Sequence, residues 1–134
     1  MESYEGNIDC VTRYFYDEKD GKLLATLNET AETGTCYIYD SLDRLISVKP
    51  AVYNASANYT PIQNAESVSY TYNSRNELTA IQTDSTVYTL VYDAFGNADS
   101  ISAGDYELAE YTYNENNGKL KEVEYGNGFK IRYV

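Results

Sequence analysis

The chain alternates apolar and polar residues in short runs, and one four-residue phrase recurs along most of its length. The phrase is an apolar residue, a variable residue, a tyrosine and then Asp or Asn. Its copies are Tyr14–Asp17, Tyr37–Asp40, Tyr70–Asn73, Leu90–Asp93 and Tyr111–Asn114, followed by the partial copy Ile131–Val134. The tyrosine in the third position, here called the marker tyrosine, stands at residues 16, 39, 72, 92, 113 and 133, so successive copies lie 23, 33, 20, 21 and 20 residues apart. This spacing indicates a structural repeat of about 20 residues with one insertion of roughly a dozen.

Each copy predicts a β-hairpin. Side chains alternate between the faces of a strand, so the first and third positions of the phrase share one face. Asp or Asn favours the first corner of the turn because its side chain accepts nearby backbone N–H groups. Gly, Asn or Asp three or four residues later favours the left-handed conformation that closes such a turn into a bulge. The predicted turn residues are Asp17, Gly21, Asp40, Asp43, Asn73, Asn76, Asp93, Gly96, Asn114 and Gly118.

A second set of turn signals lies between the copies, at Thr33-Gly34, Asp84-Ser85, Gly104-Asp105 and Gly126-Asn127-Gly128. Two turns in about 20 residues imply two short strands per repeat. β-branched residues and tyrosine dominate, and no long stretch keeps a helical period. The sequence therefore predicts an all-β fold of consecutive antiparallel hairpins that form one curved sheet, with a single repeat array over residues 1–134.

Tyrosines and the first leucine of each return strand recur at the repeat period, which favours a ladder core between stacked hairpins. The predicted core residues are Tyr14, Tyr16, Tyr37, Tyr39, Tyr70, Tyr72, Tyr92, Tyr111, Tyr113, Leu23, Leu45, Leu78 and Leu120. We expect the marker tyrosines in particular to be largely buried.

The insertion falls at Lys49–Glu66 and holds both prolines of the chain, Pro50 and Pro61. Its excess length predicts a surface loop or the tip of an extended hairpin. Cys10 and Cys36 lie in the approaches to neighbouring repeats. Strand parity places Cys10 with the tyrosines and Cys36 on the opposite face, which favours two free thiols over a disulfide.

Composition narrows the classes of function. The 134 residues carry 10 Lys+Arg against 21 Asp+Glu, a net charge of -11, which argues against binding to nucleic acid or to anionic lipid. The absence of His excludes His-based triads and His-ligated metal sites. No apolar run approaches the roughly 20 residues of a membrane span, and Met1-Glu2-Ser3 does not begin a signal peptide.

The phrase, the turn and the Gly/Asp/Asn-Arg/Lys-Leu continuation resemble the YD repeat of RHS-family proteins. Tyr37–Leu45 and Tyr125–Tyr133 carry the resemblance best, and it covers Arg13–Val134 except for the insertion. Three copies depart from the pattern, because Asn stands at positions 73 and 114 and Leu at position 90. Five copies and a partial sixth in register make the combined signal specific.

The resemblance implies both architecture and role. YD repeats of RHS proteins, and the similar region of teneurins, form a strip of hairpins that spirals into a hollow shell. The shell encloses a toxin domain in some bacterial members and is an extended scaffold in surface members. We therefore expect a non-enzymatic scaffold from a secreted or cell-surface protein, with the remaining repeats of a longer chain as partners. The Asp-Pro motifs of the family's autoproteolytic cap are absent from this sequence.

Other readings use the same residues. Exposed tyrosines that stack on sugars would make the chain a carbohydrate-binding surface module, the main alternative. Choline-binding repeats are also about 20 residues long, but their cation–π cages need Trp, and this chain has none. Asp17/Asp20 and Asp40/Asp43 lack the ligand spacing of a calcium loop, and no carboxylate pair is distinguished as that of a glycosidase. We expect no catalytic residue, metal or cofactor.

The segment Phe129–Val134 predicts an outermost strand, with Ile131 and Tyr133 on one face. Sheet edges are templates for another chain, and salt screens the opposing charge within about 8 Å. We expect self-association through terminal strands at high concentration.

Overall fold

The computed structural model describes residues 11–134, and the regular secondary structure in this range consists of twelve strands. The fold is all-β and antiparallel, as the alternation predicts. The chain divides into two compact units, Met1–Ser67 and Val68–Val134. Between residues 11 and 134 there is no helix that could cross a membrane.

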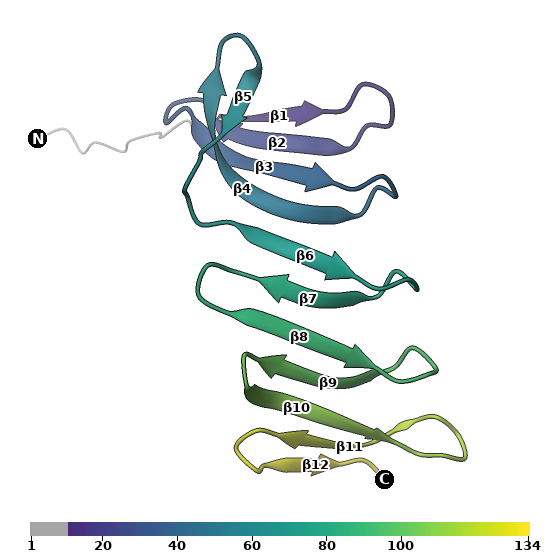
Figure 1. The fold of residues 1–134 in the computed structure, drawn as a ribbon. Coiled ribbons are helices and arrows are strands. Elements are labelled where there is room, and N and C mark those ends of the chain that lie inside the picture. Colours follow the sequence, from purple (N-terminus) through teal and green to yellow (C-terminus); the bar gives the residue numbers. More distant parts are fainter. Residues whose placement is uncertain (1–10) are drawn as a thin grey trace, which may run out of the picture. The chain divides into compact units, whose positions relative to one another are not determined.

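The first unit is a run of hairpins in which each strand pairs with the next (Figure 1). Its strands are β1 (Thr12–Tyr16), β2 (Leu23–Asn28), β3 (Thr33–Tyr39), β4 (Leu45–Asn54) and β5 (Asn58–Pro61). The second unit repeats this arrangement with seven strands between residues 68 and 134. They are β6 (Val68–Tyr72), β7 (Leu78–Gln82), β8 (Val87–Tyr92), β9 (Ala98–Ala103), β10 (Tyr106–Tyr113), β11 (Leu120–Tyr125) and β12 (Lys130–Arg132).

The structure has a turn at each of the five positions where the phrase predicts one. In every case the last turn residue donates its N–H to the carbonyl of the Asp or Asn, over 2.8–3.1 Å. That last residue has a positive φ, from 63° at Asp43 to 81° at Gly96. The strand register shifts just before the marker tyrosine of each of these five copies, so that Tyr16 pairs with Leu23 and Tyr113 with Leu120 across a bulge. The left-handed residue and the bulge are the two features that the spacing implies.

The predicted turn at Thr33-Gly34 is wrong, because both residues belong to β3. The turn lies earlier and is closed by the Glu32 N–H, which donates to the Asn28 carbonyl over 2.9 Å. Gly34 serves close packing instead: a Cβ atom at this position would lie 1.8 Å from the Thr26 carbonyl oxygen of β2. The other three predicted inter-repeat turns connect β7 to β8, β9 to β10 and β11 to β12.

The insertion forms a hairpin, so an irregular loop was the wrong choice between the two expectations. β4 continues through Pro50 to Asn54, and β5 returns beside it. Asn54 closes the tip: its Oδ1 accepts the Ser56 N–H over 2.9 Å, and its Nδ2 donates to Thr60 Oγ1 over 2.7 Å. Pro50 lies opposite Thr35 of β3 and just outside the β4–β5 ladder, which begins at Ala51–Pro61, and its carbonyl accepts the Ile62 N–H over 2.9 Å.

The core of the first unit consists of Ala25, Leu27, Cys36 and Ala51, with Phe15 and Tyr59 packed against it. Register places this core on the face opposite to the tyrosines of the phrase, since Phe15 pairs with Ala25 and Ala25 with Cys36. The rings of Phe15 in β1 and Tyr59 in β5 lie 5.6 Å apart. The first and last strands of the unit therefore meet over a face of small side chains.

The buried residues of the second unit are Ala109 and Val123. Val123 pairs with Tyr111, and Ala109 pairs with Ile101, which also pairs with Leu90. This apolar row lies on the tyrosine face, as the sequence predicts.

Burial of the tyrosines falls short of the prediction. Tyr14 and Tyr16 are 55% and 56% exposed, so placing them in the core was wrong. Both lie on β1, which has a neighbouring strand only on its β2 side among the described residues. The other predicted core residues, from Tyr37 to Tyr113 and from Leu23 to Leu120, are half-buried. A one-layer sheet shields a ring at its sides and leaves its outer surface to solvent.

Cys36 is buried and its thiol is free. It lies on the face opposite to the tyrosines, where strand parity placed it, and burial raises the pKa of the thiol. Cys10 lies outside the described residues.

Candidate functional site

The Asp or Asn of each phrase caps its own turn. Asp40 Oδ1 accepts the N–H groups of Leu42 and Arg44 over 2.9 and 3.0 Å. Asn73 Oδ1 accepts those of Arg75 and Glu77 over 2.9 and 3.1 Å. One side-chain oxygen does this work, which is why Asn can replace Asp. Equivalent bonds run to the Oδ1 atoms of Asp17, Asp93 and Asn114. Backbone N–H donors lower the pKa of Asp40 and of Asp93.

The other terminal atom of the capping side chain, Oδ2 of Asp or Nδ2 of Asn, binds the side chain four residues later. An acceptor on one residue meets a donor on the other. Asp40 Oδ2 accepts from Arg44 Nε over 2.8 Å, whereas Asn73 Nδ2 donates to Glu77 Oε1 over 2.9 Å. Asp93 Oδ2 accepts from Asn97 Nδ2 over 3.3 Å. Reasoning from sequence missed this pairing. The sequence does carry a signal for it: the pair Asp40 and Arg44 becomes Asn73 and Glu77 at the same two positions of the repeat.

The marker tyrosines join consecutive repeats by a recurrent hydrogen bond. The hydroxyl of Tyr39 donates to the Leu23 carbonyl over 2.8 Å, that of Tyr92 to the Leu78 carbonyl over 2.6 Å and that of Tyr113 to the Ala98 carbonyl over 2.6 Å. In each case the acceptor is the first residue of the preceding return strand. We call this bond the tyrosine latch.

The latch lies where the backbone ladder between neighbouring hairpins has ended. β2 and β3 pair only from Ala25–Cys36 to Asn28–Thr33, so the ladder stops before Leu23 and Tyr39. The same holds for β7 and β8, whose ladder starts at Ala80–Thr89. The tyrosine hydroxyl spans the gap and donates to a backbone carbonyl that has no partner in the ladder between these two strands. The requirement for a hydroxyl accounts for tyrosine at positions 39, 92 and 113, whereas the first position of the phrase can be Leu, as at Leu90.

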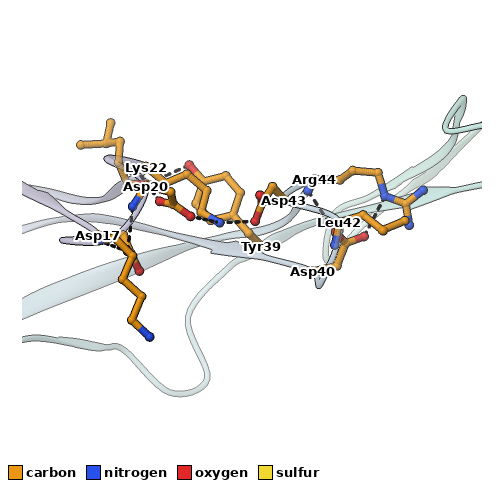
Figure 2. Close-up of polar contacts among 10 residues, drawn as sticks. Asp17, Asp20, Lys22, Tyr39, Asp40, Leu42, Asp43 and Arg44 are labelled. Carbon is orange, nitrogen blue, oxygen red and sulfur yellow. Dashed lines mark hydrogen bonds and ion pairs between the residues drawn. The ribbon is translucent and has the colours of Figure 1, made fainter.

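A cation makes a second contact between neighbouring turns (Figure 2). Lys22 Nζ binds Asp20 Oδ2 of its own turn at 2.7 Å and also binds Asp43 of the next turn, and it lies 5.5 Å from the centre of the Tyr39 ring. Hydrogen bonds to Asp20, which has the larger effect, and to Asp43 raise the pKa of Lys22. In the second unit, Arg75 donates to the carbonyl oxygens of Asp93 and Ala94, each over 3.2 Å.

A cavity of about 280 Å³ opens on the first unit, lined by Arg13, Leu27, Asn28, Glu29, Glu32 and Tyr53. Arg13 Nη2 binds Glu29 Oε1 at 2.8 Å, and the Tyr53 ring is 42% exposed. Leu27 and Tyr53 contribute the apolar part of the lining, and the other four residues contribute the polar part. Residues 11–134 hold no group of three carboxylates or thiols arranged for a metal ion.

The segment Phe129–Val134 contributes β12, which pairs with β11 through Val123–Ile131 and its neighbours. Arg132 Nε binds Glu122 Oε2 at 2.7 Å, and Lys130 Nζ binds Glu124 Oε2 at 2.9 Å. Within residues 68–134, β12 has one partner strand, and its self-association stays a prediction.

Comparison with known proteins gives a likeness of fold. No family model and no curated protein matches the sequence. Among solved structures with the same fold is the crystal structure of TcdB2-TccC3-TEV, with a TM-score of 0.64 and 14% identity. The match covers 92% of this chain and 7% of that one, so the chain spans only a small part of the length of the structure it matches.

Proposed function

We propose that this chain is part of a non-enzymatic hairpin-repeat scaffold. The observation that carries the proposal is the tyrosine latch, which recurs at Tyr39, Tyr92 and Tyr113 and in each case ties one repeat to the one before it. Its recurrence at the repeat period is the feature expected of a chain that adds hairpin to hairpin. The match over 92% of the chain to a small part of a longer protein supports the same view at the level of fold.

The charged side chains that could take part in catalysis make structural contacts instead. The carboxylates of the phrase cap turns, and the cations beside them bind carboxylates or carbonyls of the same or the next turn. An enzyme gathers such groups in a cavity, where they converge on the reacting atoms. This distribution favours a scaffold over a catalyst.

In its finer form, the proposal is a segment of a YD-type shell of the RHS family, in a secreted or cell-surface protein. Its partners are the remaining repeats of the longer chain and an enclosed toxin domain or a surface glycan. No nucleic acid, membrane insertion or cofactor is involved.

Electron microscopy of the longer protein that contains this chain tests the proposal. We expect a hollow β-sheet shell in which residues 11–134 form consecutive hairpins of the wall. A separate globular domain on a flexible linker at this position would overturn it. Far-ultraviolet circular dichroism of the chain itself is expected to show strand signal without helix.

Carbohydrate binding remains the second candidate, favoured by the exposed aromatic residues of the first unit. Tyr14 and Tyr16 are more than half exposed, with ring centres 6.4 Å apart and 20° between the rings. Tyr53 stands beside the cavity that Arg13 and Glu29 line. A glycan array with Tyr14→Ala and Tyr53→Ala distinguishes the candidates, because both side chains are exposed and their loss is expected to leave the fold intact. A binding module loses its glycan in one of them, whereas a scaffold binds no glycan before or after the change.

A further inference from the structure

Two of the five phrase turns are one residue longer than the others, and they share one backbone structure. They are Asp17–Gly21 and Asn114–Gly118. In both, the closing glycine donates its N–H to the carbonyl of the first turn residue, over 2.9 Å at Gly21 and 2.8 Å at Gly118. Both glycines have a left-handed backbone, with φ of 73° and 69°. The two turns can therefore be compared position by position.

The residue before the glycine is Asp20 in the first of these turns and Asn117 in the other. Each accepts a backbone N–H at its Oδ1 atom, from Lys22 and from Lys119, over 3.0 Å in both cases. Asp20 has a second oxygen, Oδ2, which binds Lys22 Nζ at 2.7 Å (Figure 2). Asn117 has an NH2 group in its place, which donates and cannot accept from a cation. The turn of Asn117 thus has the lysine and lacks the oxygen that would bind it.

Asn117 is also in a sequence that favours attack of the backbone on its side chain. Only two Asn-Gly pairs occur in the chain, Asn117-Gly118 and Asn127-Gly128. Glycine has no Cβ to hinder the approach of its nitrogen to the preceding side chain. All four residues are exposed to water, and a Cβ at Gly118 would meet nothing within 4 Å. These are the conditions for deamidation through a cyclic imide.

The reaction needs water and no other reactant. The Gly118 nitrogen bonds to Cγ of Asn117, and its proton leaves with the side-chain amide as ammonia. Water then opens the imide at one of its two carbonyl carbons and restores the N–H. Opening at Cγ gives Asp with the normal backbone, whereas opening at the main-chain carbonyl gives isoaspartate, in which the backbone is longer by one carbon.

The folded turn affects both steps. The Gly118 N–H is bound to the Asn114 carbonyl over 2.8 Å, so this bond must open before the nitrogen can attack. Opening of an exposed turn is a local event that leaves the rest of the sheet paired. When the imide is hydrolysed, only the normal backbone can restore the bond to Asn114 with the same turn length.

We propose that Asn117 is a site of spontaneous deamidation at which the folded turn and Lys119 select the normally linked Asp. Asp20 shows how that product fits, because it has the same backbone environment and an ion pair with the lysine two residues later. A carboxylate formed at position 117 has Lys119 at the equivalent place. The residue two positions after Asn127 is Phe129, so a carboxylate formed there gains no such partner.

Peptide mapping of the incubated chain tests this proposal. The chain is kept in mildly alkaline buffer, either folded or in urea, and is then digested. Electron-transfer fragmentation distinguishes Asp from isoaspartate at positions 117 and 127. Lys119→Met is the variant that removes the cation, and Asn127 is the internal reference in every sample.

We expect both Asn-Gly pairs to react, more slowly in the folded chain than in urea. The ratio of Asp to isoaspartate at position 117 should be higher in the folded chain than in urea. Lys119→Met should lower this folded-state ratio by up to about fivefold, the range of an exposed ion pair. The same variant should leave the ratio at position 127 unchanged.

Three results would overturn the proposal. One is an Asn117 that stays intact in the folded chain while it reacts in urea, which would mean that the turn protects it. Another is a product ratio that is the same in the folded chain, in urea and in Lys119→Met, which would mean that nothing selects the linkage. The third comes from Gly118→Ala in urea, where turn strain has no part: an unchanged rate would mean that the imide is not the route.

Discussion

The two units carry the same phrase and bury opposite faces of it. In the first, the face that contains Phe15, Ala25 and Cys36 is closed over by Tyr59, and Tyr14 and Tyr16 are left to solvent. In the second, the equivalent face carries Thr71, Thr89 and Ser102, and the tyrosine face holds the apolar row. Alternation of side chains along one strand therefore predicts that the two faces of the sheet differ. Which face becomes the core depends on the element that packs over it.

The physical cause is the extended β4–β5 hairpin. It adds a strand whose Tyr59 ring reaches the Phe15 ring of β1, so the sheet of the first unit bends over side chains no larger than Leu27. The second unit has no inserted hairpin, and its strands stay open, with polar residues on one face. An insertion of roughly a dozen residues thus changes the burial of its neighbours without changing their turns or their pairing.

The largest effect on stability is expected when the side chain at one equivalent strand position is shortened to alanine in each unit. Leu27 in β2 and Gln82 in β7 are equivalent, four residues beyond the first leucine of their strands. Leu27→Ala should lower the free energy of unfolding by about 2–5 kcal/mol because it leaves a cavity in a closed core. Gln82→Ala should change it by less than about 0.5 kcal/mol. Urea denaturation measures both, and equal losses would show that the faces do not differ.

A slightly smaller loss is expected from Gly34→Ala. The added Cβ would lie 1.8 Å from the Thr26 carbonyl, so β2 and β3 must separate. We expect about 1–3 kcal/mol and faster hydrogen exchange along the β2–β3 ladder. Gly104→Ala separates the two causes of loss, since its Cβ meets nothing within 4 Å and its φ of 58° leaves backbone strain as the cost. A stable Gly34→Ala variant with an unchanged ladder would contradict the packing.

The latch is expected to contribute about equally in both units. Tyr92→Phe and Tyr39→Phe each remove one hydroxyl bond to a carbonyl and should cost about 0.5–1.5 kcal/mol. Tyr14→Phe removes a hydroxyl that makes no such bond to residues 11–134 and should be neutral. Thermal unfolding followed by circular dichroism measures the three variants. A neutral result at Tyr92 would mean that the carbonyl is equally well served by water.

The smallest effect concerns the paired residues of the turns. Asn73→Asp places a carboxylate beside Glu77 and should destabilise the turn by about 0.5 kcal/mol through repulsion of like charges. Glu77→Arg in the same chain recreates the Asp40–Arg44 arrangement of the first unit and should restore the loss. Chemical denaturation of the four members of this cycle gives the coupling. Additive effects would show that the matched polarities are accidental.

Much of the local structure follows from residues near one another in the chain. Asp40 and Asp43 set a turn because a side-chain oxygen and a left-handed residue act within four positions, and the same holds at Asn73 and Asn76. The failure at Thr33-Gly34 had the opposite origin. Gly34 is required because β2 packs closely against it. The sequence alone does not distinguish a glycine needed for close packing from a glycine in a turn.

The candidate site divides in the same way. The turn caps could be predicted from the type of residue, but the latch could not, because its acceptor lies 14–16 residues earlier on another hairpin. Lys22 bridges Asp20 and Asp43 for a similar reason: the second partner comes near only when two turns lie side by side. The sequence by itself determined strands, turns, bulges and the repeat, since these depend on side-chain alternation and on backbone preferences over a few residues. Only the tertiary structure decided which face is buried, because Phe15 and Tyr59 are 44 positions apart and burial depends on which distant surface excludes the water.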